Sequence, residues 1–510
     1  MEQLSGQDAM FLHAELDGLP QHIGGVSIYD QSTAPDGVVR FKQVLNMLEG
    51  RLHKSPIFRR KLAEVPLGLG RPYWVEDPDF DLEYHVRHIA LPKPGDWRQL
   101  CILAARIHAR PLDRSRPLWE IYVIEGLNNV EGLPSNCFAL LLKVHHCAMD
   151  GATGAQFMNI MHDLTPEIVP SGPIPNRVIR MPSKIEMLGK AYVDAWKSPK
   201  QTFDALRASI PSYQRVKEGK RKQDFHTLDD KQKTRFQGKI SRHRVVEGRK
   251  FDFEQVREIK NSVAGATIND AMLTVVAGGL RKYLQSKNEL PDSTLVSGCP
   301  IDVRSPEERA AGGNMIGYMN VALRTEIEDP LKRLKAVHEE SLSAKAYAEA
   351  MGPRVMVDVT ELIPGNVLSL AIRAASATGL VEANVIQNTI VTNVPGAPFA
   401  LFMCGAELVD SFSLGPLLPN VGLFHIVYSA VQNKKGRITL SFTACRDMLP
   451  DPAFYADCLQ ESFDELYAAA TASIKRADKA AKAATKETKK SAAKKRATKK
   501  PASKKSSVTA

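Results

Sequence analysis

The stretch "LLKVHHCAMDGATGAQ", residues 141–156, places two adjacent histidines, an aspartate and a glycine directly after an apolar run. "CFALLLKV" at 137–144 is mostly apolar and of strand length, which predicts a strand buried on both faces. "ATGAQFMNIMHDL" at 152–164 has the apolar spacing of a helix, and Gly151 permits a tight turn before it. We therefore expect His145, His146 and Asp150 at a strand-to-helix turn.

Several roles are open to two adjacent histidines in this position. A metal site normally needs three or four ligands, and neither an HExxH motif nor a cysteine pair supplements them, so no metal is expected. A Ser-His-Asp triad would need a nucleophile signature such as GxSxG, which is absent. Two roles remain: a buried histidine satisfied by the backbone, or a general base, for which an imidazole pKa of about 6.5 is suited.

The alternation of strand side chains allows both roles at once. Consecutive residues on a strand point to opposite faces, so one histidine can face a cavity while the other packs or orients it. Asp150 lies beyond the turn and is better placed to fix the backbone through a buried ion pair than to touch a substrate. From chemistry alone, the motif indicates a base without a covalent nucleophile.

The composition is that of a water-soluble protein with a separate basic end. Its 510 residues are 44% hydrophobic and 25% charged, which suits two domains. The net charge of the chain is +11. Residues 475–510 carry 14 Lys/Arg and 2 Asp/Glu, a net charge of +12, so residues 1–474 have a net charge of −1. Nucleic acid is therefore not an expected partner, while anionic lipid would attract the tail.

Cysteine usage and the first residues predict a cytoplasmic protein. The seven cysteines are scattered and form no CxxC pair, which fits reduced thiols. "MEQLSGQDAM" lacks the features of a signal peptide, and no apolar run approaches the roughly 18 residues of a membrane span.

The pattern along the chain predicts a mixed α/β fold with two domains. Residues 1–165 form the first domain and carry the histidine motif; 166–243 form a partly mobile linker or crossover; 244–474 form the second domain; 475–510 form a disordered Lys/Ala-rich tail. Within the first domain, a helix is expected over 36–52, with Asp36 as its cap.

At this point the sequence resembles a known family. "HHCAMDG" matches the HHxxxDG signature of acyl-CoA-dependent acyltransferases and of condensation domains. The chain looks more specifically like the bacterial wax ester synthase/diacylglycerol acyltransferases, from residue 4 to about 470. The further matching segments, in chain order, are "LSGQDAMFLHAE", "HIGGVSIYD", "PLDRSRPLWEIYVIEGL", "TINDAMLTVVAGGLR", "PIDVRSPEERAAGGNMIGYM" and "VTNVPGAP".

The resemblance implies a two-domain architecture like that of chloramphenicol acetyltransferase, with the active site at the domain interface. It implies transfer of a fatty acyl group from acyl-CoA to a long-chain alcohol or a diacylglycerol, with no cofactor beside the acyl-CoA substrate. His146 would be the general base and His145 its neighbour that orients the site. Asp150 would pair with Arg304 of "PIDVR".

The resemblance also assigns supporting residues. Asn269 and Asp270 form its Asn-Asp pair; the Asn269 amide could support the oxyanion, and a helix cap is the alternative. Pro117, Leu118 and Trp119 form its PLW element, with an ordinary core aromatic as the alternative for Trp119.

One departure affects the expected acceptor pocket. Family members often have Gly/Ala-Leu-Asn before the strand near residue 426, where this chain has "VGLFHIVYS", with Phe424 and His425 around the place of the asparagine.

The predicted acyltransferase function has two alternatives. One is another HHxxxDG enzyme of the condensation type, and the other is a non-catalytic lipid-surface protein in which the tail dominates. For the acyltransferase, we expect peripheral association with the inner membrane or with lipid inclusions.

Overall fold

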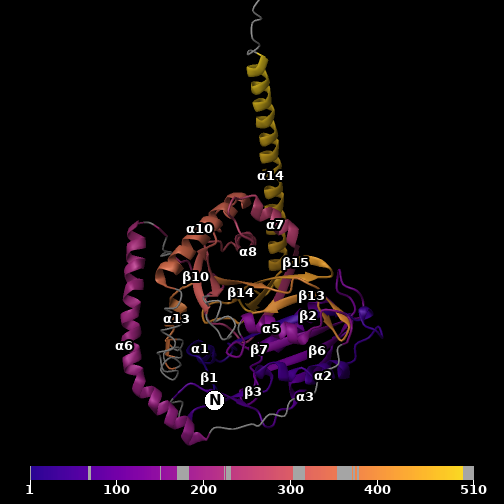
Figure 1. Ribbon diagram of the computed structural model, residues 1–510, viewed down its shortest axis with the longest axis vertical. Coiled ribbons are helices and arrows are strands. Elements are labelled where there is room, and N and C mark those ends of the chain that lie inside the picture. Colours follow the sequence, from indigo (N-terminus) through magenta and orange to yellow (C-terminus); the bar gives the residue numbers. More distant parts are fainter. Residues whose placement is uncertain are drawn as a thin grey trace, which may run out of the picture.

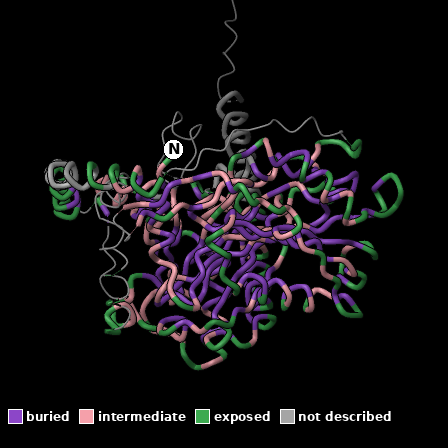
Figure 2. Tube along the Cα trace, turned by 90° about the horizontal axis from the view of Figure 1, so that it is seen from below, coloured by how far each residue is buried: buried purple, intermediate pink, exposed green. Residues whose placement is uncertain are grey.

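The computed structural model describes residues 2–66, 70–149, 151–168, 183–222, 224–225, 231–302, 316–352, 370, 374–375 and 378–497. Two six-stranded mixed sheets with helices packed on them make up the body (Figure 1). Buried residues gather in its interior and exposed ones along its rim (Figure 2). The expected mixed α/β class with two domains is thus present.

The first sheet carries the histidine motif on a central strand. Its order is β12-β13-β2-β7-β6-β5, antiparallel except for the β5/β6 pair. Its strands are β2 (His22–Asp30), β5 (Val86–Ala90), β6 (Trp119–Leu127), β7 (Cys137–His145), β12 (Phe402–Met403) and β13 (Ala406–Leu414). Because β12 and β13 come from the second half of the chain, this sheet is completed only when both halves fold together.

The second sheet has the order β10-β9-β11-β14-β15-β8, with β11 parallel to both of its neighbours. Its strands are β8 (Arg244–Asp252), β9 (Val296–Asp302), β10 (Ile316–Ala322), β11 (Thr389–Pro395), β14 (Leu423–Gln432) and β15 (Lys435–Cys445). A small antiparallel sheet joins β1 (Glu2–Gln3), β4 (Tyr73–Glu76) and β3 (Arg60–Ala63).

Most helices pack on the sheets, and α4 lies between the first sheet and β8 of the second. The α-helices are α1 (Gly6–Ala14), α2 (Phe41–Glu49), α3 (Leu82–His85), α4 (Trp97–His108), α5 (Gly151–Met161), α6 (Lys184–Lys222), α7 (Phe253–Asn261), α8 (Ile268–Ser286), α10 (Pro330–Met351), α13 (Leu380–Ala383) and α14 (Pro452–Ala497). Short 3-10 helices of the described residues include η1 (Gln31–Thr33), η2 (Leu52–Lys54) and η3 (Pro56–Phe58). Helices α7, α8, α10 and α14 enclose the largest core with the second sheet.

A smaller apolar cluster joins the two domains. Leu19, which precedes β2, packs with Phe424 and Ile426 of β14 and with Leu417. These side chains lie on the face of the second sheet opposite the helix-covered core, since strand residues alternate between faces. The seam between the domains is therefore partly apolar.

Two expectations about local structure need correction, and the expected linker or crossover contains a long helix. The helix expected over 36–52 begins only at Phe41, with Arg40 as its N-cap, because Asp36 precedes a turn at Gly37 (φ 66°). Helix α6 extends over 39 residues of the expected linker, and Figure 1 shows it standing along one side of the body. The part 475–497 of the expected disordered tail continues α14, which projects from the body; Ala and Lys are strong helix formers, and the packed first turns supply the nucleus.

Candidate active site at the domain interface

The backbone of the histidine motif is held by three segments. Strand β7 pairs with β2 and β6 along its length and ends at His145. The His145 N–H donates to the Leu118 carbonyl (3.0 Å), and the His146 N–H donates to the Gln21 carbonyl (2.9 Å). Helix α5 begins at Gly151. The predicted strand, turn and helix are confirmed.

His145 is buried and paired with a carboxylate. Its side chain is 1% exposed, and its Nε2 lies 3.2 Å from Glu15 Oε2. Because the Cys147 N–H donates to Nδ1 (3.1 Å), the proton of the neutral ring sits on Nε2 and is donated to Glu15. Burial lowers the pKa of His145, and the Glu15 carboxylate offsets only part of that effect.

Glu15 is itself kept ionised by this contact. Burial acts to raise its pKa, but the hydrogen bonds and charges of His145 and Arg114 outweigh burial and lower it. Arg114 Nη2 lies 2.5 Å from Glu15 Oε2, so the carboxylate bridges the imidazole and a guanidinium. This arrangement fixes both the tautomer and the orientation of His145.

His146 has different surroundings from its neighbour. It is only partly buried, and its ring lies parallel to that of Phe11, with centroids 3.9 Å apart and an interplanar angle of 4°. Phe11 lies on α1, whose first turn is capped by the Ser5 side chain. Stacking on a ring of a rigid helix limits rotation of the His146 imidazole.

Hydrogen bonds place this end of β7 at the domain interface. The Gln21 side-chain amide donates to the Leu417 carbonyl (3.2 Å), while the Gln21 carbonyl holds His146. Beside it, His22 Nε2 lies 2.7 Å from the His108 carbonyl, and His108 Nε2 lies 3.0 Å from the Gly415 carbonyl. Gln21 thus contacts both Leu417 and His146, so the second half of the chain lies next to the motif.

The PLW element supports the motif from the neighbouring strand. Leu118 is 1% exposed and belongs to the apolar cluster that also contains Phe11. Trp119 is fully buried, donates from Nε1 to the Phe58 carbonyl (3.0 Å) and stacks on His85. Trp119 thus occupies the core-aromatic position, and Pro117 is buried two residues before the start of β6.

The Asn-Asp pair lies at the start of α8. Asp270 forms a capping box with Thr267: the Asp270 N–H donates to Thr267 Oγ1 (3.1 Å), and the Thr267 N–H donates to Asp270 Oδ2 (2.9 Å). His338 Nδ1 lies 2.9 Å from the same oxygen. The structure therefore places Asp270 in the helix-cap role, while Asn269 is partly exposed in the first turn.

Other predicted residues have mixed outcomes. Asp150 and Arg304 lie outside the described residues. His425 is fully buried, with Nε2 2.8 Å from the Tyr455 hydroxyl and Nδ1 3.0 Å from Thr389 Oγ1, and burial lowers its pKa to about 3. His425 therefore lies in the helix-covered core, whereas Phe424 belongs to the cluster at the seam.

The contacts of Glu15 and Phe11 are not apparent from their sequence positions. Both lie in "LSGQDAMFLHAE", which the resemblance marks only as the family's opening segment. Glu15 and His145 are 130 residues apart, and no sequence pattern links them. Their contact forms only when α1 packs over the end of β7.

Among the described residues, no group of three or more His, Cys, Asp or Glu side chains could hold a metal ion. All seven cysteines are buried and free. Within the same described part of the chain, every helix is too short or too polar to span a bilayer.

Comparison with known proteins identifies the family. Residues 4–272 match the model of the wax ester synthase/diacylglycerol acyltransferase catalytic domain, and residues 312–467 match that of the WS/DGAT C-terminal domain. The chain belongs to the wax ester synthase/diacylglycerol acyltransferase family. It is accordingly an acyltransferase, as the ordered motifs predict.

The relatives and solved structures agree with this family. A Mycobacterium tuberculosis (strain CDC 1551) protein whose name describes a diacylglycerol O-acyltransferase is 32% identical over 470 residues, which cover 91% of this chain and 90% of the relative. The wax ester synthase/diacylglycerol acyltransferase of Marinobacter aquaeolei VT8 has the same fold (TM-score 0.65, 23% identity, 92% of this chain and 100% of that one).

More distant structures share the architecture. Trichothecene 15-O-acetyltransferase from Fusarium sporotrichioides aligns with a TM-score of 0.56 at 11% identity over 92% of this chain and 95% of its own. The starter condensation domain of rhizomide synthetase aligns with a TM-score of 0.52 at 12% identity over 92% and 95%. The predicted acyltransferase architecture with two domains is confirmed.

Proposed function

We propose that this acyltransferase moves a fatty acyl group from acyl-CoA to the hydroxyl of a long-chain alcohol, of a diacylglycerol, or of both. The names of its relatives support this substrate class. The observation that carries the proposal is the difference between the two histidines at the domain interface: His145 is buried and tied to Glu15, whereas His146 is partly exposed and held by Phe11.

In the proposed reaction His146 is the general base. It accepts the proton of the acceptor hydroxyl, and the hydroxyl oxygen attacks the thioester carbonyl carbon. The resulting tetrahedral oxyanion collapses, the carbon–sulfur bond breaks, and the CoA thiolate takes the proton from the imidazolium. No covalent acyl-enzyme forms, and the protein's own residues supply all the acid–base chemistry without a metal or a further cofactor.

His145 and Glu15 are positioning residues in this scheme. Their buried hydrogen bond fixes the end of β7, from which His146 projects, and Phe11 limits the rotation of the base. Such pre-orientation counts because a misplaced base loses much of its rate advantage. Asp150 pairing with Arg304, and an Asn269 amide that supports the oxyanion, remain part of the proposal on the strength of the family resemblance.

The test measures thiol release from palmitoyl-CoA with hexadecanol or with diacylglycerol as the acceptor. Loss of a general base lowers the rate by about 10²–10⁴-fold, so His146→Ala should be nearly inactive. His88→Ala, which removes a half-exposed histidine elsewhere, should retain activity. If the wild type releases no more thiol than His146→Ala with either acceptor, the proposal fails; release only with an amine acceptor would favour the condensation-type alternative.

Peripheral association with a lipid surface is a second part of the proposal. Residues 475–510 carry the net +12, and each basic residue near an anionic surface contributes about 1 kcal/mol. Deleting 475–510 should weaken binding to vesicles that contain phosphatidylglycerol, and added salt should weaken the binding of the full chain. Binding that neither change alters would contradict this part.

A further inference from the structure

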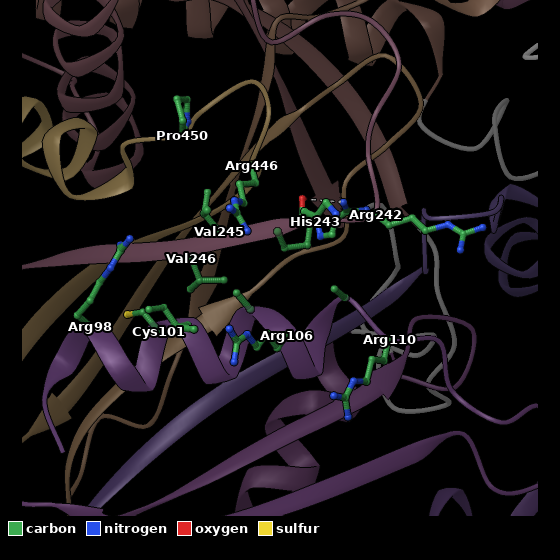
Figure 3. Close-up of a pocket in the computed structure, with 14 residues that line it drawn as sticks. Arg98, Cys101, Arg106, Arg110, Arg242, His243, Val245, Val246, Arg446 and Pro450 are labelled. Carbon is green, nitrogen blue, oxygen red and sulfur yellow. Dashed lines mark hydrogen bonds between the residues drawn. The ribbon is translucent and has the colours of Figure 1, made fainter. Parts of the chain in front are cut away.

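An arginine-rich cavity of about 470 Å³ lies where α4 of the first domain faces β8 of the second. We call it the arginine pocket; its basic residues are Arg98, Arg106, Arg110, Arg242, Arg244, Arg446 and His243. Figure 3 shows Arg98 and Arg106 on α4, with Arg446, Arg242 and His243 across from them. The pocket is distinct from the histidine motif and plays no part in the proton transfer described above.

The positive charge of the pocket is largely uncompensated. Among the described residues, no carboxylate lies within 4 Å of Arg98, Arg106, Arg110, Arg244 or Arg446; only Arg242 at the rim pairs with a carboxylate, the exposed Asp17. Like charges that line one cavity repel one another, so the arrangement becomes more favourable when an anion occupies it.

Arg244 strengthens this inference. It is 7% exposed, and within the described chain its guanidinium donates to backbone carbonyls alone, those of Ser241, His243 and Gly18. Burying a guanidinium without a counter-charge is costly, and a bound anion would offset that cost.

The pocket also has apolar walls. Ile102 and Ala105 of α4 face Val245 and Val246 of β8, and Pro450 closes one side. Ile102 is 38% exposed, so an apolar side chain is accessible to a ligand at this wall. Apolar walls beside guanidinium groups suit a ligand with a flat ring and several phosphates.

Both walls of the pocket contact segments that lie close in sequence to the residues of the active site. The Arg110 carbonyl accepts a hydrogen bond from Lys143 Nζ (3.0 Å), and Lys143 precedes His145 by two residues on the same face of β7. On the other wall, Arg244 Nη2 lies 2.5 Å from the Gly18 carbonyl, three residues beyond Glu15. The pocket therefore adjoins the segments that hold the histidine motif.

We propose that the arginine pocket binds the 3′-phosphate and diphosphate of the nucleotide end of acyl-CoA, with the adenine between the apolar walls. This inference rests on the proposed function, because acyl-CoA is the donor in it. The phosphate chemistry is shared with one other source, the headgroups of anionic lipids, and the experiment separates the two.

The first test compares two donors that differ only in the nucleotide. Arg106 and Arg446 are exposed residues on opposite walls, so R106E/R446E should fold. The ratio of kcat/KM for palmitoyl-CoA to that for palmitoyl-pantetheine should fall at least tenfold in this variant. R257E, a charge reversal of an exposed arginine on α7, should leave the ratio unchanged. An unchanged ratio in R106E/R446E would overturn the proposal.

The second test does not depend on catalysis. Calorimetry should show that adenosine 3′,5′-bisphosphate binds the wild-type protein and R257E, and that R106E/R446E binds it at least tenfold more weakly. If the wild type shows no binding, the pocket assignment is wrong even where thiol release is normal. If the bisphosphate binds as expected but no acyl-CoA reacts, the proposed function fails and the pocket stands.

The third test measures binding to vesicles of phosphatidylglycerol and phosphatidylcholine. We expect R106E/R446E to retain vesicle binding close to that of R257E. Loss of vesicle binding together with unchanged bisphosphate binding would assign the pocket to a lipid headgroup and overturn the assignment to CoA.

Discussion

Three buried histidines should make the fold sensitive to mild acid. Burial lowers the pKa of His108 and of His425 to about 3 and that of His162 to about 4, whereas an unfolded histidine has a pKa of about 6.5. Burial also lowers the pKa of His22, in the same direction. The unfolded chain therefore binds protons that the native fold excludes.

The sign and size of the effect follow from linkage. A histidine whose folded pKa is lowered leaves stability intact above pH 6.5, and stability is lost as the pH falls toward the folded pKa. At pH 5.5 the unfolded form of each histidine is about 90% protonated, so the three together bind almost three extra protons on unfolding. Between pH 7 and 5.5 they remove roughly 4 kcal/mol of stability, a large part of a typical total.

Proton uptake on unfolding measures this directly. The protein is unfolded with guanidinium chloride in weakly buffered solution at pH 5.5, and the acid needed to hold the pH constant is recorded. His425→Gln should reduce the uptake by about 0.9 proton relative to wild type. Tyr455→Phe is the matched control, because it removes the hydrogen-bond partner of His425 Nε2 but keeps the titrating ring. Equal uptake by wild type and His425→Gln would refute the reasoning.

Three further changes probe the site. Glu15→Gln removes the charged partner of His145 and should lower kcat about ten- to hundredfold without raising the KM for acyl-CoA. Steady-state thiol release measures both constants. An effect confined to KM would contradict a positioning role. Phe11→Leu removes the ring stacked on His146 and should lower kcat by up to about tenfold. An unchanged kcat would contradict this role of Phe11. Asp270→Ala should cost about 1–3 kcal/mol of unfolding free energy in urea; lost kcat with unchanged stability would instead assign Asp270 to catalysis.

Much of the local structure around the motif was predictable from the sequence. The apolar run at 137–144, the glycine at 151 and the helical spacing beyond it define a strand, a turn and a helix, and β7 and α5 match them. These signals are local because backbone geometry and side-chain period act over a few residues. The ordered motifs likewise identified the family and its architecture.

Some errors of prediction came from competing local signals. The strong N-cap tendency of Asp36 did not decide the start of α2, because Gly37 turns the chain and the Val39 N–H donates to Gln31. The tail composition indicated disorder, yet the packed start of α14 extends helix into it. In both cases a neighbouring contact outweighed residue preference.

By itself the sequence determined the strand, the turn and the two histidines, because these depend on residues close together in the chain. Only the tertiary structure decided which surroundings each histidine has. Glu15 reaches His145 across 130 positions, α1 brings Phe11 onto His146, and β13 returns from beyond residue 400 to pair with β2. The arginine pocket is decided in the same way, since α4 and β8 face each other only after both domains have packed. Contacts between distant segments form only when burial offsets the entropy of closing long loops, which no local pattern encodes.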